Sequence, residues 1–255
     1  MISNFLEILI LSMVQGISEF LPVSSSAHLF LVSEIYEFKS QSLLMDIGLH
    51  LGSLLAIIFY FRNELKNITN NKSLFLLIVF GSLPLIILGF IVYKSGLINY
   101  LRNIEIIAWT TLIFALLLFI ADKFEINKKI EADLQPKSIL IIGLFQVLAL
   151  IPGVSRSGIV ITAGRFLNFS RYDSTKISFY LSIPAIAGAS FLGLKNLIEK
   201  NINFNFIVLI SIVLSFIFSY LTIKYFLIFI KKFSLNTFVI YRITLSLILF
   251  LIIYI

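Results

Sequence analysis

The sequence predicts an all-α polytopic membrane protein with six transmembrane helices and two broken-helix, re-entrant hairpins, arranged as an inverted-topology repeat. Three observations support this fold class. Hydrophobic residues make up 59% of the 255 residues and charged residues only 13%, whereas a water-soluble chain needs a far more polar surface. Several apolar runs reach the ~18–20 residues that cross a bilayer as a helix. Two further apolar stretches are interrupted by clusters of Pro, Ser and Gly.

The composition also excludes several classes of function. The chain contains no cysteine, which rules out disulfides, thiol nucleophiles and cysteine-ligated metals. The net charge is +7, but the basic residues are spread over the predicted loops and helix ends. This distribution indicates membrane topology and lipid-headgroup contact, and we expect no nucleic-acid binding. The start of the chain lacks a basic region and a cleavage site, so we expect the first segment to remain in the protein.

The elements follow from the apolar runs. Six runs predict full transmembrane spans, at about 43–61, 74–93, 105–121, 177–194, 205–230 and 238–255. The stretches 5–40 and 138–170 are broken by "LPVSSSA" at 21–27 and "IPGVSRSG" at 151–158. Polar backbone at membrane depth is tolerated only where protein or a wet cavity surrounds it. Each broken stretch therefore predicts a re-entrant hairpin.

The two breaks resemble each other, which predicts an internal repeat. An offset of 131 (154 − 23) places Val23 and the serines after it on Val154 and "SRS", and it also places Gln15 on Gln146. We expect one integral-membrane domain over residues 1–255. Repeat 1 covers about 1–121 and repeat 2 about 138–255, joined by a polar loop at 122–137. Because each half has one hairpin and three crossings, the second half must be inverted.

The distribution of basic residues predicts the orientation. The richer set of loops contains Arg62, Lys66, Lys72, Lys123, Lys128, Lys129, Lys137, Lys231 and Lys232. The alternate loops are poorer and contain Lys94, Arg102, Lys195 and Lys200. The positive-inside rule assigns the richer set to the cytoplasm and both termini to the outside. The first hairpin then enters from outside and the second from the cytoplasm, a transporter-like arrangement with a polar site at the repeat interface.

The polar breaks predict a phosphate site. Pro22 and Pro152 interrupt their helices because proline lacks an amide hydrogen and restricts the residue before it. The serines that follow are good N-caps for the helix that restarts, and a helix N-terminus favours phosphate. Arg156 adds a guanidinium that can hold phosphate oxygens in bidentate fashion.

The first break also carries groups suited to phosphoryl transfer. Gln15 and Glu19 are four residues apart and share a helix face, and His28 follows Ser24 by four residues and Ser25 by three. A glutamate can hold a divalent metal, a histidine can act as base or nucleophile, and an arginine can stabilise phosphoryl charge. An anionic substrate would bring the metal with it, because magnesium favours carboxylate plus phosphate oxygens.

These stretches resemble a known family. "QGISEFLPVSSSAH" and "PGVSRSG" are similar to the two signature motifs of the undecaprenyl-diphosphate phosphatase family, also called bacitracin-resistance proteins, and "LHLGSLLAI" at 49–57 and "YRI" at 241–243 resemble further family stretches. The resemblance covers almost the whole chain. It implies hydrolysis of undecaprenyl diphosphate to the monophosphate and inorganic phosphate, which recycles the lipid carrier for peptidoglycan and confers bacitracin resistance. Gln15 stands where some relatives have glutamate, which weakens any mechanism that needs two carboxylates here.

Residues and motifs together give the following candidate site. The expected catalytic residues are Glu19, Ser25, His28 and Arg156, with Glu19 as a metal ligand. The expected substrate-binding residues are Gln15, Ser24, Ser26, Gly153, Ser155, Ser157 and Gln146. The nucleophile stays open between Ser25, His28 and water. The expected cofactor is a divalent cation, Mg2+ or Ca2+, and the expected partners are undecaprenyl diphosphate and membrane lipids, with a homodimer as one assembly. The family implies a bacterial inner membrane and a site that faces the periplasm.

Two alternatives remain at this level. An inverted repeat also suits a transporter or flippase of a phosphorylated polyprenyl lipid, because architecture alone does not choose between chemistry and transport. The acid-phosphatase-like lipid phosphatases need a second histidine near a downstream arginine, but the chain has only His28 and His50 and neither follows Arg156. We expect His50, which lies inside a span without a polar cluster, to be a packing residue.

Overall fold

The computed structural model describes residues 2–36, 38, 42–70, 72–126, 128–199 and 206–255. The described residues form helices and connecting turns, with one isolated bridge between Lys128 and Phe169 and no strand. Six helices are long and apolar enough to cross a membrane: α3 (Leu43–Tyr60), α5 (Lys72–Ser95), α7 (Ile104–Asp122), α11 (Arg171–Glu199), α12 (Phe206–Lys232) and α13 (Asn236–Tyr254). The prediction of six spans is confirmed, although the expected first residue of the fifth, 205, lies outside the described residues.

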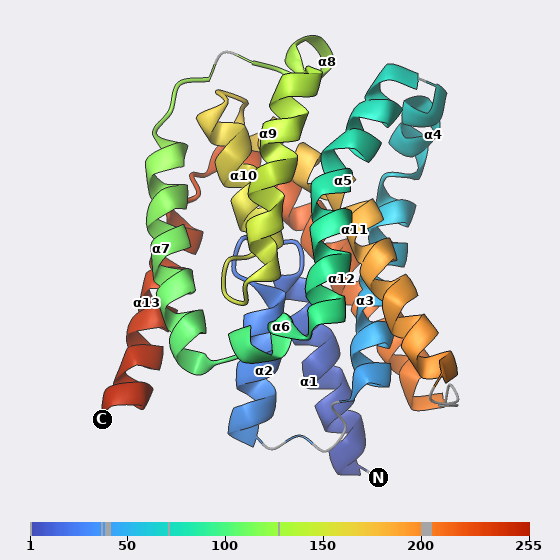
Figure 1. The fold of residues 1–255 in the computed structure, drawn as a ribbon, viewed down its shortest axis with the longest axis vertical. Helices are drawn as coiled ribbons and strands as arrows, with labels where there is room; N and C mark the ends of the chain where they lie inside the picture. Colours follow the sequence, from blue (N-terminus) through green and yellow to red (C-terminus); the bar gives the residue numbers. More distant parts are fainter. Residues whose placement is uncertain (1, 37, 39–41, 71, 127, 200–205) are drawn as a thin grey trace.

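Two shorter helix pairs lie between these long helices. Helices α1 (Ile2–Ser18) and α2 (Ser25–Tyr36) form one pair, and α9 (Pro136–Val147) and α10 (Arg156–Phe166) form the other. In Figure 1 the first pair extends from the end of the molecule that holds both termini, and the second extends from the opposite end. The turns of both pairs lie near mid-height, so each predicted break is a turn within the molecule.

Proline and serine account for the local structure of the turn between α9 and α10, called the second turn below; the turn between α1 and α2 is the first turn. A short 3-10 helix, η1 (Leu148–Leu150), ends α9, and Pro152 follows it. Ser155 then caps α10, because its Oγ accepts a hydrogen bond from the Gly158 amide at 3.2 Å. The chain therefore leaves one helix and starts the next within a few residues.

The two halves pack closely through small residues. Helix α3 lies against α12, and α1 lies against the same helix. A Cβ added to Gly52 would lie 2.4 Å from the Ile212 carbonyl oxygen, so only glycine allows this approach. Beside it the Ser53 hydroxyl contacts the hydroxyls of Ser215 and Ser219 at 3.2 and 3.0 Å. Small side chains and interhelical hydroxyl contacts are typical of helix packing in lipid.

The upper end of the molecule in Figure 1 is held by one buried carboxylate. Asp122, at the end of α7, accepts two hydrogen bonds from Arg171 at 2.6 and 3.0 Å. It also accepts the Leu235 amide at 3.2 Å, in the turn between α12 and α13. The fully buried Arg165 lies 3.7 Å from the same carboxylate. These contacts tie the base of the α9–α10 pair to three of the long helices, so the cluster is structural.

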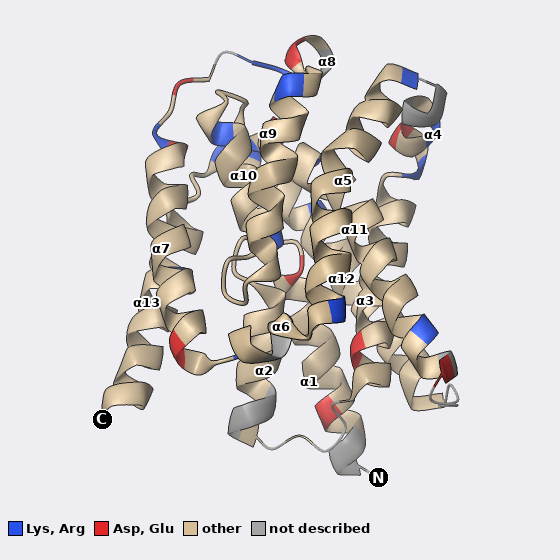
Figure 2. Cartoon of the chain, in the orientation of Figure 1, with Lys and Arg blue, Asp and Glu red and all other residues tan. Residues whose placement is uncertain are grey.

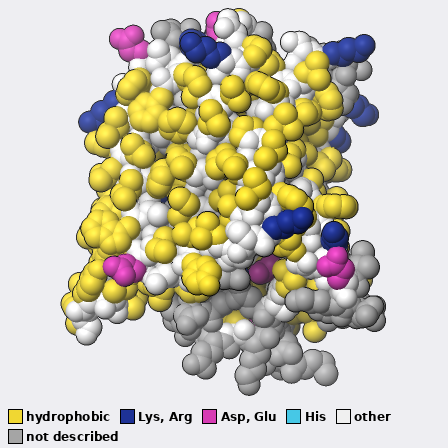
Figure 3. Space-filling view, viewed as in Figure 1, with side chains coloured by type: hydrophobic (Ala, Val, Ile, Leu, Met, Phe, Trp, Pro, Cys, Tyr) yellow, Lys and Arg dark blue, Asp and Glu magenta, His cyan; other side chains and the backbone are white. Residues whose placement is uncertain are grey.

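The surface agrees with a membrane environment. Figure 3 shows hydrophobic side chains over the middle of one face, with most charged side chains near its upper and lower margins. In Figure 2, Lys and Arg gather at the upper end, around α4 (Arg62–Asn70) and α8 (Ile130–Asp133). Together with the six apolar helices, this pattern indicates a multi-pass membrane protein.

Three short helices were not predicted. Helices α4 and α6 (Leu97–Leu101) lie in segments expected to be loops, and α8 lies within the polar segment 122–137. All three lie at the ends of the long helices, where the sequence lacks the long apolar run that identified the spans. Polar connections can form short helices here because water or headgroups satisfy their exposed backbone groups.

Candidate active site

A single carboxylate lies at the turn of the α1–α2 pair. Glu19 directly follows α1, and 7% of its side chain is exposed. Gln15, one helical turn earlier, donates from Nε2 to Glu19 Oε2 at 3.1 Å. The Ser25 hydroxyl, at the start of α2, donates to the same oxygen at 2.6 Å. The turn thus folds back so that groups on both of its helices hold one carboxylate oxygen.

The second turn supplies the counter-charge. Arg156, the first residue of α10, forms an ion pair with Glu19, with 3.1 Å between its Nη2 and Glu19 Oε1. It also donates to the Glu19 main-chain carbonyl at 3.4 Å and to the Ser178 carbonyl, on α11, at 3.3 Å. Its side chain is 13% exposed. Two of the expected catalytic residues, Glu19 and Arg156, are therefore in direct contact across the two turns.

The two turns also resemble each other in backbone conformation. Ser24 and Ser155 have left-handed φ values of 78° and 71°, a conformation that is uncommon for residues other than glycine. Each serine hydroxyl faces the hydroxyl two residues later, at 3.5 Å for Ser24 and Ser26 and at 3.2 Å for Ser155 and Ser157. Ser157 also donates to the Leu21 carbonyl at 2.7 Å, so the turns are in direct contact.

A second arginine, which the sequence analysis did not select, joins the two turns. Arg242 on α13 is fully buried. It donates to the Pro22 carbonyl of the first turn at 3.4 Å and to the Gly153 and Val154 carbonyls of the second at 2.9 and 3.1 Å. The available signal was an arginine inside an apolar span, which is costly and usually functional. "YRI" was noted only as a family stretch.

His28 lies one turn into α2, beside Ser25, but its ring nitrogens point to other groups. Nδ1 lies 2.7 Å from the Ser24 carbonyl oxygen, which can only accept, so Nδ1 is the donor. Nε2 lies 2.5 Å from the hydroxyl of Tyr241, a residue not selected from the sequence. Described residues therefore engage both ring nitrogens, and neither contacts Glu19.

The remaining expected binding residues occupy different environments. Gly153 adopts a positive φ of 89° and presents its carbonyl to Arg242. Ser26 is exposed at the edge of the first turn. Gln146 on α9 is fully buried, and both polar atoms of its side-chain amide lack a partner among the described residues. Gln146 is thus buried at α9, and it makes no hydrogen bond to Glu19 or Arg156.

The side chains around Glu19 decide whether the site can hold a metal ion. Within the described part of the chain, no group of three or more His, Asp or Glu side chains could enclose a metal ion. Glu19 already accepts bonds on both of its oxygens, and Arg156 places a positive charge beside it. These residues do not fit a resident metal ion. One carboxylate suits at most a divalent cation that arrives with phosphate oxygens of its own.

The arrangement combines a hydroxyl held by a carboxylate with a guanidinium and a helix N-terminus. A hydroxyl becomes a nucleophile when an adjacent base takes its proton, and guanidinium and backbone amide groups stabilise phosphoryl charge. Fold and site together define a multi-pass helical membrane protein with a buried centre suited to phosphoryl chemistry.

Comparison with known proteins gives the family. The family model for bacitracin resistance protein BacA matches residues 8–248, and the chain belongs to this family. A protein of Pelagibacter ubique (strain HTCC1062) named undecaprenyl-diphosphatase is 62% identical over 255 residues, which cover all of both chains. Undecaprenyl-diphosphatases of Saccharophagus degradans and Elusimicrobium minutum are 40% and 42% identical and cover 95% and 94% of this chain and 96% and 95% of their own.

Proposed function

We propose that this protein is an undecaprenyl-diphosphatase. It hydrolyses undecaprenyl diphosphate to undecaprenyl phosphate and inorganic phosphate, which returns the lipid carrier to peptidoglycan synthesis and underlies resistance to bacitracin. The observation that carries the proposal is the contact of Ser25 and Arg156 with opposite oxygens of Glu19, at 2.6 and 3.1 Å. This geometry supports phosphoryl transfer, and relatives that align over the full chain bear the same activity in their names.

The contacts favour Ser25 as the nucleophile. Its hydroxyl already donates to Glu19, so the carboxylate can accept the proton as Oγ forms a bond to the terminal phosphorus. The bond from that phosphorus to the bridging oxygen breaks, Glu19 gives its proton to that oxygen, and undecaprenyl phosphate leaves. Water then hydrolyses the phosphoserine, with Glu19 as the base, and releases inorganic phosphate. Gln15 keeps Glu19 oriented throughout.

Arg156 and the start of α10 stabilise the charge that is transferred. The guanidinium carries five donors in a planar fork, and only part of them is used by Glu19 and Ser178. Phosphoryl oxygens can take the others as the substrate enters. Arg242 contributes indirectly, because its bonds to both turns fix the separation of Ser25 and Arg156.

In this proposal a divalent cation reaches the site only when it is bound to the diphosphate of the substrate. Mg2+ or Ca2+ carried on the diphosphate oxygens would have Glu19 as its protein ligand, and it would supply neutralisation of phosphate charge. The steps described above are those of the protein's own residues. A chelator tests this part of the proposal, because a substrate-borne cation must be present for full activity.

The orientation of the site is also part of the proposal. The helix ends around α4, α8 and the α12–α13 turn carry most of the basic residues, which favours that end as cytoplasmic. The opposite end, with both termini, then faces the periplasm of a bacterial inner membrane. The α1–α2 and α9–α10 pairs would be re-entrant hairpins of an inverted repeat, with the reaction site between their turns. Matching left-handed φ values at Ser24 and Ser155 support this relation.

Phosphate release by the purified protein tests the function. In detergent, with undecaprenyl diphosphate as substrate, we expect timed release of inorganic phosphate that falls with a chelator and returns when a divalent cation is added. Detergent provides no second compartment, so a protein that only moves the lipid would release none. Absence of phosphate release in a folded preparation would overturn the phosphatase proposal, and full activity in chelator would overturn the role of the cation.

A further inference from the structure

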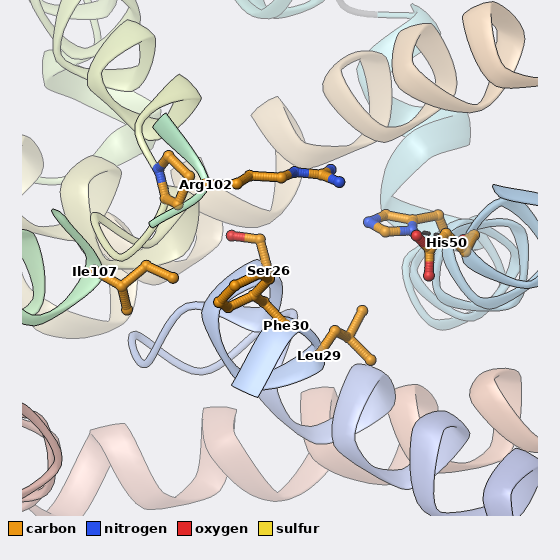
Figure 4. Close-up of a pocket in the computed structure, with 8 residues that line it drawn as sticks. Ser26, Leu29, Phe30, His50, Arg102 and Ile107 are labelled. Atoms are coloured by element: carbon orange, nitrogen blue, oxygen red, sulfur yellow. Dashed lines mark hydrogen bonds between the residues drawn. The ribbon is translucent and has the colours of Figure 1, made fainter. Parts of the chain in front are cut away.

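A cavity of about 90 Å3 lies beside the first turn, and Glu19 is not among the residues that line it. Figure 4 shows the side chains that line it, including Ser26 of α2, His50 of α3 and Arg102, which follows α6. Pro152 of the second turn also lines it. A water molecule occupies ~30 Å3 in the liquid, so this volume suits a small polyatomic ion.

The polar groups that reach this cavity have hydrogen-bonding atoms that no described residue uses. Arg102 makes no hydrogen bond or ion pair with any described residue. His50 donates from Nδ1 to the Asp46 carbonyl at 2.7 Å, which leaves Nε2 without a described partner. Within the described part of the chain, the Ser26 hydroxyl has only the 3.5 Å contact with Ser24. In Figure 4 the ends of the Arg102 and His50 side chains point toward each other, and the Ser26 hydroxyl lies below the start of the Arg102 side chain.

We propose that this cavity binds a phosphate group through Arg102, His50 and Ser26. A phosphate oxygen accepts hydrogen bonds from a guanidinium and a hydroxyl, and from an imidazole Nε2 that carries a proton, so one phosphate group can bind all three side chains. Ser26 is adjacent to Ser25 in the chain, and Pro152 precedes Gly153 of the second turn, so the cavity adjoins the reaction site. Asp46, which also lines it, opposes an anion and limits the affinity.

The phosphate has two sources, and the inference rests on the proposed function for both. It is either the second phosphate of the diphosphate headgroup, held while the terminal one reacts, or inorganic phosphate on its way out. The first source makes the cavity a substrate subsite. The second makes it a product site beside the first turn.

The experiment compares Arg102→Gln, His50→Gln and Asp46→Asn with Lys94→Gln in the full-length protein. Lys94 is a matched control because it lies in the last turn of α5, near the same end, but contacts the Phe90 ring at 4.8 Å and does not line the cavity. Three quantities are measured: KM and kcat for undecaprenyl diphosphate, the inhibition constant for inorganic phosphate, and the rise in Tm that inorganic phosphate produces.

A substrate subsite predicts that Arg102→Gln raises KM about tenfold, with a smaller rise in His50→Gln and a fall in Asp46→Asn. A product site predicts the same order in the inhibition constant for phosphate, with KM unchanged. The Lys94→Gln variant should match the wild type in either case. The Tm measurement does not depend on catalysis, so it tests this inference separately from the proposed activity. Phosphate should raise the Tm of the wild type and should not raise the Tm of Arg102→Gln.

Two results would overturn the inference. In the first, Arg102→Gln and Lys94→Gln behave alike in KM, in phosphate inhibition and in phosphate-dependent Tm, as expected if Arg102 only contacts lipid headgroups. In the second, Asp46→Asn and Arg102→Gln change phosphate binding in the same direction, because loss of a carboxylate and loss of a guanidinium must have opposite effects on an anion site.

Discussion

Glu19 accepts three side-chain donors on two oxygens, and they come from both turns of the molecule. Burying a carboxylate is costly unless it is paired and hydrogen-bonded, and here Gln15, Ser25 and Arg156 meet that need. The same contacts define chemical roles, because one partner can give up a proton and another is a cation. His28 is different: its two nitrogens bond to Ser24 and Tyr241, so it positions the start of α2.

The roles of Ser25 and His28 can be separated by substitution. We expect Ser25→Ala to lower kcat for phosphate release by about 10³-fold, because the oxygen that attacks phosphorus is lost. His28→Gln should lower kcat by only about tenfold, since a glutamine can still bond to neighbouring groups on α2. Ser18→Ala is the control, because among the described residues the Ser18 hydroxyl bonds only to the Val14 carbonyl of its own helix. Equal losses in the Ser25 and His28 variants, with both proteins folded, would contradict this assignment.

At the scale of the elements, the turn of the α9–α10 pair depends on Gly153. Its φ of +89° is unfavourable for other residues, and an added Cβ would lie 2.1 Å from Thr110 Oγ1 and 2.9 Å from the Ile107 carbonyl oxygen. Its carbonyl also accepts a bond from Arg242. Backbone conformation, close packing and the bond between the two turns therefore coincide at one residue.

We expect Gly153→Ala to lower the stability of the folded protein by ~2–5 kcal/mol, as the sum of left-handed strain and overpacking. Gly96→Ala is a matched comparison because Gly96 has a φ of +69° with nothing within 4 Å of an added Cβ. Its cost should be ~1–2 kcal/mol. Thermal unfolding in detergent measures both variants. Equal stability of the two would show that the turn is not tightly packed around Gly153.

The sequence predicted elements better than contacts. Apolar length alone identified the six spans, and Pro22 and Pro152 located the breaks, because both signals are local. Glu19 and Arg156 were both expected at one site, because charges inside a membrane are costly and usually functional. The positive φ of Ser24 and Ser155 was not predicted, because serine gives no sign of left-handed backbone. The bonds from Arg242 and Tyr241 were missed too, since they depend on how α13 packs more than 200 residues from the first turn.

At the scale of the whole molecule, a reaction site that faces the periplasm requires the upper end in Figure 1 to face the cytoplasm. Because the chain has no cysteine, single cysteines can report accessibility without a background. Lys129 precedes α8, and Tyr100 on α6 is 81% exposed near the opposite end. In intact cells we expect a membrane-impermeant thiol reagent to label Tyr100→Cys, and to label Lys129→Cys only after permeabilisation. The reverse pattern would invert the proposed orientation.

The central claim is that two turns from opposite ends of the molecule share one reaction site, and a double-mutant cycle on kcat/KM for phosphate release tests it most directly. Glu19→Gln and Arg156→Gln should each lower kcat/KM at least ~100-fold, and the double variant should lose about as much as the more damaging single change, because residues that act as a unit are not additive. Losses that multiply in the double variant, or near-normal activity in either single one, would contradict the shared site.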